Sequence, residues 1–130
     1  MAPDKVRRET GAAATRSFGR EAEERAAAYL EKLGYRVLQR NYRCRGGEID
    51  LVALDGATLV FVEVKARHSD HFGTSGEAIG RRKAHHLRVA AATYLTVQGA
   101  MAGSIWEQPP CRFDAVLFDE DTVEHLKDVL

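Results

Sequence analysis

The sequence has few cysteines and no long apolar run, and both absences narrow the classes of protein that it can encode. Its 130 residues include two cysteines, Cys44 and Cys111, with no CxxC motif and no Cys/His spacing typical of a zinc site. We therefore expect two reduced thiols in a cytoplasmic protein. No apolar stretch approaches the roughly 18 residues that cross a bilayer, and residues 1–8 lack the apolar core of a signal peptide.

Neither sign of charge is in excess, because 19 Lys and Arg residues balance 19 Asp and Glu residues. The balance hides an asymmetry: residues 1–100 hold 17 basic against 12 acidic residues, and residues 101–130 hold 2 against 7. Local fields steer charged ligands more than the total charge does, so the neutral total does not exclude a polyanionic partner. A set of scattered, solvated charges is the alternative interpretation.

Helical and strand-like patterns alternate along one predicted domain at 17–130, which follows a polar, Ala-rich tail at 1–16 that we expect to be disordered. Apolar spacing predicts helices at 17–33, 77–97 and 121–128, and strands at 35–42, 48–54, 59–66 and 112–119. The segment Asp55-Gly56 is a strong hairpin signal between the second and third strands. The order predicts an α/β fold in which a mixed sheet is flanked by helices.

Acidic side chains lie inside two of these apolar strands. Glu48 and Asp50 belong to the first, and Glu63 and Lys65, two residues apart, belong to the second. An acid inside an apolar strand is unfavourable unless something pairs with it, which makes these positions candidates for a functional site. A cross-strand ion pair on a solvated face is the alternative. Phe61 shares a face with Glu63, however, so that face is expected to be at least partly covered.

The register of the hairpin decides whether these acids meet. A two-residue loop at 55–56 would put Glu48 opposite Glu63, with Asp50 on the diagonal. A four-residue loop at 55–58 would put Asp50 directly opposite Glu63. Both registers bring the acids to one side of the sheet, whereas a three-residue loop would separate them.

Converging carboxylates without His or Cys ligands suit a hard divalent cation such as Mg²⁺, with Mn²⁺ as a possible substitute. The candidate ligands are Asp50, Glu63 and Glu48. Lys65 would point at the same site, where it could orient or deprotonate a water molecule or stabilise charge on a phosphate. Glu23, on the flank of the first helix, is a candidate fourth carboxylate, and a residue that merely borders the core is the alternative.

Basic residues gather at the start of the second predicted helix and around the strands. Basic side chains at a helix N-terminus oppose the helix dipole, and phosphate contacts would explain their presence. A solvated basic face is the alternative. The adjacent His85 and His86 cannot both face one metal ion from a helix, so we expect exposed or phosphate-contacting roles for them. The predicted nucleic-acid-binding residues are Arg43, Arg45, Arg67 and Lys83.

Several motifs together resemble the YraN family of bacterial endonuclease-like proteins, over about residues 18–119. They are Gly19-Arg20-Glu21-Ala22-Glu23, Asn41-Tyr42-Arg43, Gly47-Glu48-Ile49-Asp50-Leu51-Val52, Phe61-Val62-Glu63-Val64-Lys65-Ala66-Arg67, Lys83 and Arg112-Phe113-Asp114. That family is similar to archaeal Holliday-junction resolvases and belongs with the restriction-endonuclease-like nucleases of the PD-(D/E)XK type. The resemblance implies an αβββαβ core and a catalytic motif of Asp50, Glu63 and Lys65, with Glu23 as an additional helix acid. Ile49 stands where the motif usually has Pro.

The sequence therefore predicts a metal-dependent nuclease that hydrolyses DNA phosphodiester bonds, with branched or damaged DNA among the candidate substrates. A homodimer is compatible with the resemblance to resolvases. The main alternative is a catalytically inactive nucleic-acid-binding module that retains the nuclease fold, and a third hypothesis is a protein-interaction adaptor. Cleavage, salt-sensitive binding without metal dependence, or no nucleic-acid affinity would distinguish these three functions.

Overall fold

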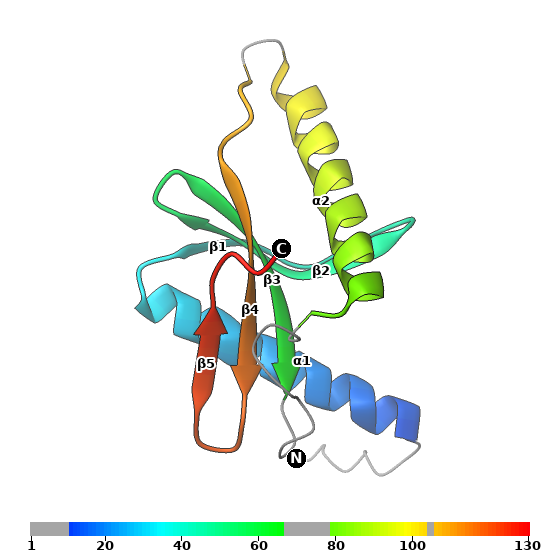
Figure 1. The fold of residues 1–130 in the computed structure, drawn as a ribbon, viewed down its shortest axis with the longest axis vertical. Coiled ribbons are helices and arrows are strands. Elements are labelled where there is room, and N and C mark those ends of the chain that lie inside the picture. The colour runs from blue at the N-terminus through cyan, green and yellow to red at the C-terminus, as the bar shows by residue number, and fades with distance from the viewer. Residues whose placement is uncertain (1–10, 67–78, 104–105) are drawn as a thin grey trace.

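A computed structural model describes residues 11–66, 79–103 and 106–130 of the chain. Two helices and five strands make up this part (Figure 1). They are α1 (Gly11–Lys32), β1 (Arg36–Cys44), β2 (Gly47–Asp55), β3 (Thr58–Ala66), α2 (Arg81–Ala102), β4 (Cys111–Phe118) and β5 (Val123–Leu126). Neither described helix is long and apolar enough to cross a membrane.

The strands form a single mixed sheet in the order β1-β2-β3-β4-β5. β1, β2 and β3 form an antiparallel meander, β4 runs parallel to β3, and β5 returns antiparallel to β4. The parallel pair requires a long crossover, which includes α2. The run Ala115–Phe118 of β4 is buried throughout, as a strand covered on both faces should be.

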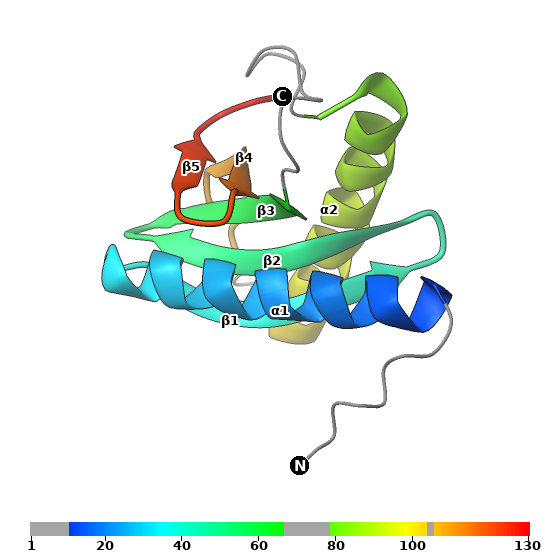
Figure 2. The ribbon, with the colours of Figure 1, turned by 90° about the horizontal axis from the view of Figure 1, so that it is seen from below.

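The helices cover opposite faces of the sheet, and each helix packs on its own apolar core (Figure 2). A smaller third cluster contains Ala115 and Leu117 of β4. Small residues on α1 allow the helix to approach the sheet closely, because alanine side chains add little thickness to the interface. The core under α1 contains Ala22, Ala26, Ala27, Leu30, Tyr35, Leu51, Ala53, Val60, Val62, Val116 and Phe118. The core under α2 contains Ile49, Val52, Leu59, Phe61, Leu87, Ala90, Ala91 and Tyr94. The predicted fold class is confirmed, and the arrangement is consistent with a restriction-endonuclease-like αβββαβ core.

The hairpin between β2 and β3 adopts the register that puts Asp50 across from Glu63. Leu54 pairs with Leu59, as in the four-residue-loop alternative, and Asp55 pairs with Thr58 to leave a two-residue turn. Gly56 in this turn has φ 63°, a left-handed conformation that glycine adopts without strain.

The C-terminal segment differs from the prediction, because 123–126 is a strand and the helix expected at 121–128 is not formed. Without β5, the apolar strand β4 would be an edge strand with unpaired backbone groups. Val123 pairs with Phe118 and Leu126 with Ala115, and a backbone bond from the Asp119 N–H to the Thr122 oxygen (2.9 Å) closes the reversal. Tertiary pairing therefore outweighs the local helix preference of this charged segment.

The helix boundaries also move. α1 begins at Gly11, within the tail that was expected to extend to residue 16, and α2 runs from Arg81 to Ala102 rather than 77–97. Residues 1–10, 67–78 and 104–105 lie outside the described residues.

Candidate active site: a buried carboxylate cluster between the two helices

The site begins where β2 and β3 stop pairing. Their ladder ends at Leu51 and Val62, one pair before Asp50 would meet Glu63. Beyond this point the Asp50 side chain replaces the strand pairing, because its Oδ2 accepts a hydrogen bond from the Val64 N–H at 2.8 Å. A carboxylate thus satisfies a backbone donor that strand pairing would otherwise have satisfied.

The alternation of β2 also breaks at Asp50. Ile49 and Leu51 should share a face in a regular strand, yet Ile49 packs in the core under α2 and Leu51 in the core under α1. Asp50 lies between them. This irregularity allows one carboxylate to interact both with Glu23 from α1 and with Glu63 on β3.

Glu63 is the most deeply buried acid of this cluster, with 5% of its surface exposed. Its Oε2 lies 3.6 Å from Nζ of Lys83, which extends from the first turn of α2. Its Oε1 is buried with no hydrogen-bond partner. A buried carboxylate oxygen without a partner is energetically unfavourable, so this position calls for a functional explanation.

Burial and mutual repulsion shift the titration of the three acids in the same direction. Burial, followed by repulsion from Asp50, raises the pKa of Glu63 to about 8. The same two causes in the same order raise the pKa of Glu23 to about 7. Burial also raises the pKa of Asp50, although the Val64 hydrogen bond and the positive charge of Lys83 act against it. The cluster thus resists carrying all its negative charges at once.

Two lysines contribute positive charge from different elements. Lys65 follows Glu63 by two residues on β3 and lies close enough for its charge to lower the pKa of Glu63 against the dominant effect of burial. Lys83 acts on Glu63 in the same way and also on Asp50. The structure therefore brings Asp50, Glu63, Lys65, Glu23 and Lys83 into one region.

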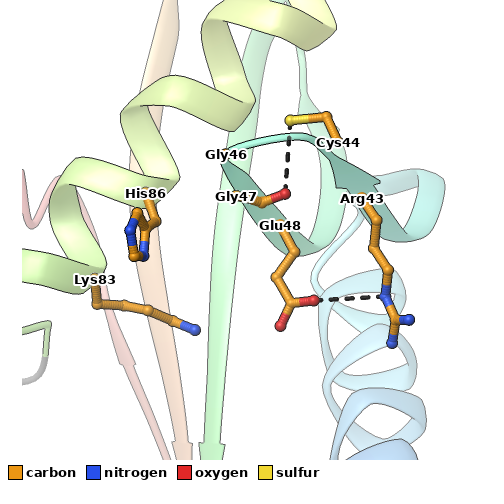
Figure 3. Close-up of a pocket in the computed structure, with 7 residues that line it drawn as sticks. All are labelled: Arg43, Cys44, Gly46, Gly47, Glu48, Lys83 and His86. Carbon is orange, nitrogen blue, oxygen red and sulfur yellow. Dashed lines mark hydrogen bonds and ion pairs between the residues drawn. The ribbon is translucent and has the colours of Figure 1, made fainter.

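An open cavity of about 430 Å³ adjoins this cluster, because Lys83 lines the cavity and its Nζ lies 3.6 Å from Oε2 of Glu63. Figure 3 shows the side chains that line the cavity. At its mouth, Nε of Arg43 lies 3.4 Å from Oε1 of Glu48, and both side chains are substantially exposed. Glu48 therefore lies at the solvent edge of the site with a partner of its own, although its charge raises the pKa of Asp50 and Glu23 after larger causes. The cavity is lined by Arg43, Cys44, Gly46, Gly47, Glu48, Lys83 and His86.

Of the other predicted nucleic-acid-binding residues, Arg45 is among those that the structure describes and is not one of the residues that line the cavity. Arg45 is in the exposed turn between β1 and β2. Arg67 lies outside the described residues.

The carboxylates fit a divalent cation by their chemistry. Oxygen donors of high negative charge suit Mg²⁺, and a cation would relieve both the repulsion and the missing partner of Glu63 Oε1. Among the described residues, no group of three His, Cys, Asp or Glu side chains forms a ready-made metal site. Asp50 and Glu63 are the residues that would hold a cation, because Asp50 repels Glu63 and Glu63 Oε1 has no hydrogen-bond partner, with Glu48 and Glu23 at the periphery.

A second buried polar cluster lies on the opposite face of the sheet, and sequence reasoning missed it. Asp114 on β4 is fully buried and interacts with Arg112 through Nε (2.9 Å) and Nη2 (3.1 Å). His125 Nε2 lies 2.8 Å from its Oδ2, and the Asp128 N–H donates to Oδ1 at 3.1 Å. The signal for this cluster was an acid directly before the apolar run of β4, where burial is expected.

The same cluster extends through Arg112. This guanidinium donates to Asp55 Oδ2 at 3.0 Å and to the Tyr35 hydroxyl at 2.7 Å. The network therefore links β4 to the β2–β3 hairpin and to the residue just before β1. Its members form hydrogen bonds with one another, which is typical of a structural part of the core rather than of a ligand-binding site.

The fold and the site define a class of mixed α/β domains with a buried carboxylate–lysine cluster where two antiparallel strands diverge. The chain belongs to the family described as Uncharacterised protein family UPF0102, whose model matches residues 22–118. The matched segment contains the whole carboxylate cluster and Asp114.

Relatives in several bacteria cover most of the chain. A UPF0102 protein of Pelotomaculum thermopropionicum is 50% identical over 110 residues, which is 83% of this chain and 87% of the relative. One from Dechloromonas aromatica is 45% identical over 113 residues, covering 87% of this chain and 88% of the relative. One from Janthinobacterium sp. is 41% identical over 112 residues, covering 86% and 85%.

Proposed function

We propose that this protein is a cytoplasmic, Mg²⁺-dependent nuclease that hydrolyses phosphodiester bonds in DNA. One observation carries the proposal: Glu63 is almost fully buried beside Asp50 and near Lys65 and Lys83, and one of its oxygens has no partner. A structural acid would have its hydrogen bonds satisfied, whereas an acid that receives a cation needs an oxygen without a protein partner.

The residues divide into those that hold the cation and those that act on the substrate. Asp50 and Glu63 would bind the cation, and Glu23, whose pKa is raised by burial and then by repulsion from the nearby Asp50, would support Asp50 from α1. A bound divalent cation supplies Lewis-acid stabilisation to a phosphoryl oxygen and lowers the pKa of water.

The two lysines would have separate roles. Lys65 would orient the attacking water or stabilise the charge that develops on the phosphate. Lys83 and Arg43 are at the exposed side, where they would contact the DNA backbone. Arg45 and Arg67 are further candidates for backbone contacts, and branched or damaged DNA remains the proposed substrate class.

The test is cleavage of labelled linear, single-stranded and four-way DNA in Mg²⁺ or Mn²⁺. We expect Lys65→Met to reduce the cleavage rate by about 10²- to 10⁴-fold, as removal of a positioned proton-transfer group does. Glu63→Gln should abolish metal-dependent cleavage, because it removes a negative charge from the cation site. The exposed Glu21→Gln on α1 is the matched control and should retain the wild-type rate.

The outcome separates the proposal from its alternative. Salt-sensitive DNA binding with no cleavage by any variant would indicate the catalytically inactive binding module. Cleavage that Glu63→Gln retains at the wild-type rate would show that the activity arises elsewhere.

A further inference from the structure

Two glycines, Gly46 and Gly47, form one wall of the cavity beside the carboxylate cluster and pack against α2. A Cβ at Gly47 would collide with the backbone carbonyl of His86, and one at Gly46 would lie 2.9 Å from the Val89 side chain. Gly46 also has φ 113°, which a larger residue would adopt with strain. The β1–β2 turn therefore packs directly on the helix, and this end of the cavity is built by close backbone contact.

The polar groups of the cavity suit a phosphate-bearing ligand. Among the lining residues, Lys83 and Arg43 carry positive charge and Glu48 carries negative charge, and His86 adds a ring with hydrogen-bonding nitrogens (Figure 3). Arg43 is held by Glu48 across an exposed 3.4 Å contact, which is weak enough for a phosphate to compete with it.

The size of the cavity limits what can enter it. Its volume of about 430 Å³ lies at the lower end of the range of about 300 to 1,000 Å³ for small-molecule sites. A group of nucleotide size can occupy such a space, but a base-paired duplex cannot. Enzymes that modify a base hold the extruded base in a pocket, which shows that a protein cavity can accommodate a single unpaired nucleotide.

The cavity is connected to the carboxylate cluster by one side chain. Lys83 lines the cavity, and its Nζ lies 3.6 Å from Oε2 of Glu63. A strand with one nucleotide in the cavity would therefore place a neighbouring phosphate near Glu63 and Asp50.

We infer that this cavity binds one unpaired nucleotide of a DNA strand, so that the site acts on DNA with unpaired nucleotides in preference to intact duplex. The inference rests on the proposed nuclease function and specifies its substrate class. The recognised feature is an anionic sugar–phosphate with a base free of its pairing partner.

Binding measurements without divalent metal test the inference independently of cleavage. A labelled single strand, a blunt duplex, and the same duplex with one bulged nucleotide are titrated with protein in EDTA. We expect the single strand and the bulged duplex to bind about tenfold more tightly than the blunt duplex. Equal affinity for the bulged and the blunt duplex would overturn the inference.

Blocking the cavity by alkylation of Cys44 tests whether the cavity itself is the binding site. In a Cys111→Ser protein the remaining thiol, Cys44, lines the cavity and can be alkylated. Alkylation should remove the preference for unpaired DNA, while the unmodified Cys111→Ser protein keeps it. Circular dichroism of both forms verifies that they are folded, and retention of the preference after alkylation would contradict the assignment.

A histidine pair supplies a second arm that needs no chemical modification. His86→Ala should weaken binding of the bulged duplex by a few-fold and leave the blunt duplex unchanged, because His86 lines the cavity. His85→Ala is the matched control, since His85 is the adjacent exposed residue and is not part of the cavity wall. Equal effects of the two substitutions would count against the cavity as the binding site.

The remaining outcomes separate the two proposals. A preference for unpaired DNA without any cleavage in Mg²⁺ would overturn the proposed nuclease activity and leave the nucleotide site intact. Cleavage with no such preference would overturn only the nucleotide site. Displacement of the strand by an equal concentration of a nucleoside monophosphate would identify a free nucleotide as the ligand and overturn the assignment to DNA.

Discussion

Two buried acids on neighbouring parallel strands have opposite environments in this protein. Glu63 on β3 is 5% exposed and Asp114 on β4 is fully buried, and they lie one residue apart in the strand register. Asp114 has Arg112, His125 and the Asp128 N–H as partners, whereas Glu63 has Lys83 at 3.6 Å and one oxygen with none. Depth of burial alone therefore does not determine whether the oxygens of an acid have hydrogen-bond partners.

The two environments also produce opposite pKa shifts. Burial alone would raise the pKa of Asp114, but hydrogen bonds from His125, Arg112 and the Asp128 N–H outweigh it and lower the pKa. Burial and repulsion from Asp50 raise the pKa of Glu63 to about 8. The satisfied acid stabilises the fold in its charged form, and the unsatisfied acid stabilises it in its protonated form.

The largest expected effect on stability comes from the satisfied acid. Asp114→Asn should lower the free energy of unfolding by about 3 to 5 kcal/mol, because it leaves the partly buried Arg112 without its main counter-charge. Urea unfolding at neutral pH measures the change, and the exposed Asp121→Asn should shift it little. A loss of under about 1 kcal/mol would show that the network around Asp114 does not hold the sheet together.

The next effect is a dependence on pH that comes from the unsatisfied acid. The pKa of Glu63 rises from 4.5 to about 8 on folding, so its contribution to stability is fully present below about pH 4.5 and is lost as the pH rises to about 8. One pKa unit corresponds to about 1.4 kcal/mol, so we expect a fall of roughly 2 to 4 kcal/mol between pH 5 and pH 8.

One substitution separates this slope from other titrations. Glu63→Gln should reduce the fall measured by urea unfolding across that range, because the amide does not ionise, and Glu23, whose pKa is also raised, to about 7, accounts for part of the fall that remains. Asp114 contributes with the opposite sign: its stabilisation is present above about pH 3.8 and is lost as the pH falls through its lowered pKa. An unchanged slope in Glu63→Gln would mean that other groups are responsible.

Addition of Mg²⁺ should offset the penalty at the unsatisfied site. At pH 8, where the carboxylates are more charged, Mg²⁺ at one hundred times its dissociation constant should stabilise the fold by about 2.7 kcal/mol. Thermal unfolding with and without Mg²⁺ measures this, and Asp50→Asn or Glu63→Gln should remove most of the shift. If Mg²⁺ stabilised both variants as much as it stabilises the wild-type protein, the cation would have to bind elsewhere.

The smallest effect tests the periphery of the structural network. Tyr35→Phe removes the hydrogen bond that the Tyr35 hydroxyl accepts from Arg112 at 2.7 Å and should lower the free energy of unfolding by about 1 kcal/mol. Tyr29→Phe should have a smaller effect, since the Tyr29 hydroxyl lies 3.4 Å from His125 Nδ1. Neither substitution should change DNA cleavage, and a loss of cleavage in Tyr35→Phe would couple the two clusters.

Sequence patterns predicted much of the fold because the apolar periods of the strands are strong and local. The three strands of the meander, the strand β4 and the hairpin at Gly56 followed from alternation, apolar runs and turn chemistry. The C-terminal strand β5 did not, because its preference is set by the edge of β4, which is formed only in the folded sheet. The start of α1 at Gly11 was missed for want of an apolar period in 11–16.

The site was also only partly predictable. The acids of β2 and β3 could be identified because acids in apolar strands are unusual, and both register alternatives brought them together. The break in alternation at Asp50 and the capture of the Val64 N–H depend on where the ladder ends. The alternation of apolar and polar residues along a strand does not show where its pairing with the next strand ends.

By itself, the sequence determined which strands form the core and which residues could carry metal-dependent chemistry, since these depend on local periodicity and residue type. Only the tertiary structure decided which buried acid has hydrogen-bond partners for both of its oxygens. Glu63 and Asp114 both lie in apolar strands, and their difference comes from partners that the topology brings in from distant segments: Lys83 from α2, and His125 and the Asp128 N–H from β5 and the segment after it. The free energy of a buried charge depends on those partners, and no local pattern in the chain specifies them.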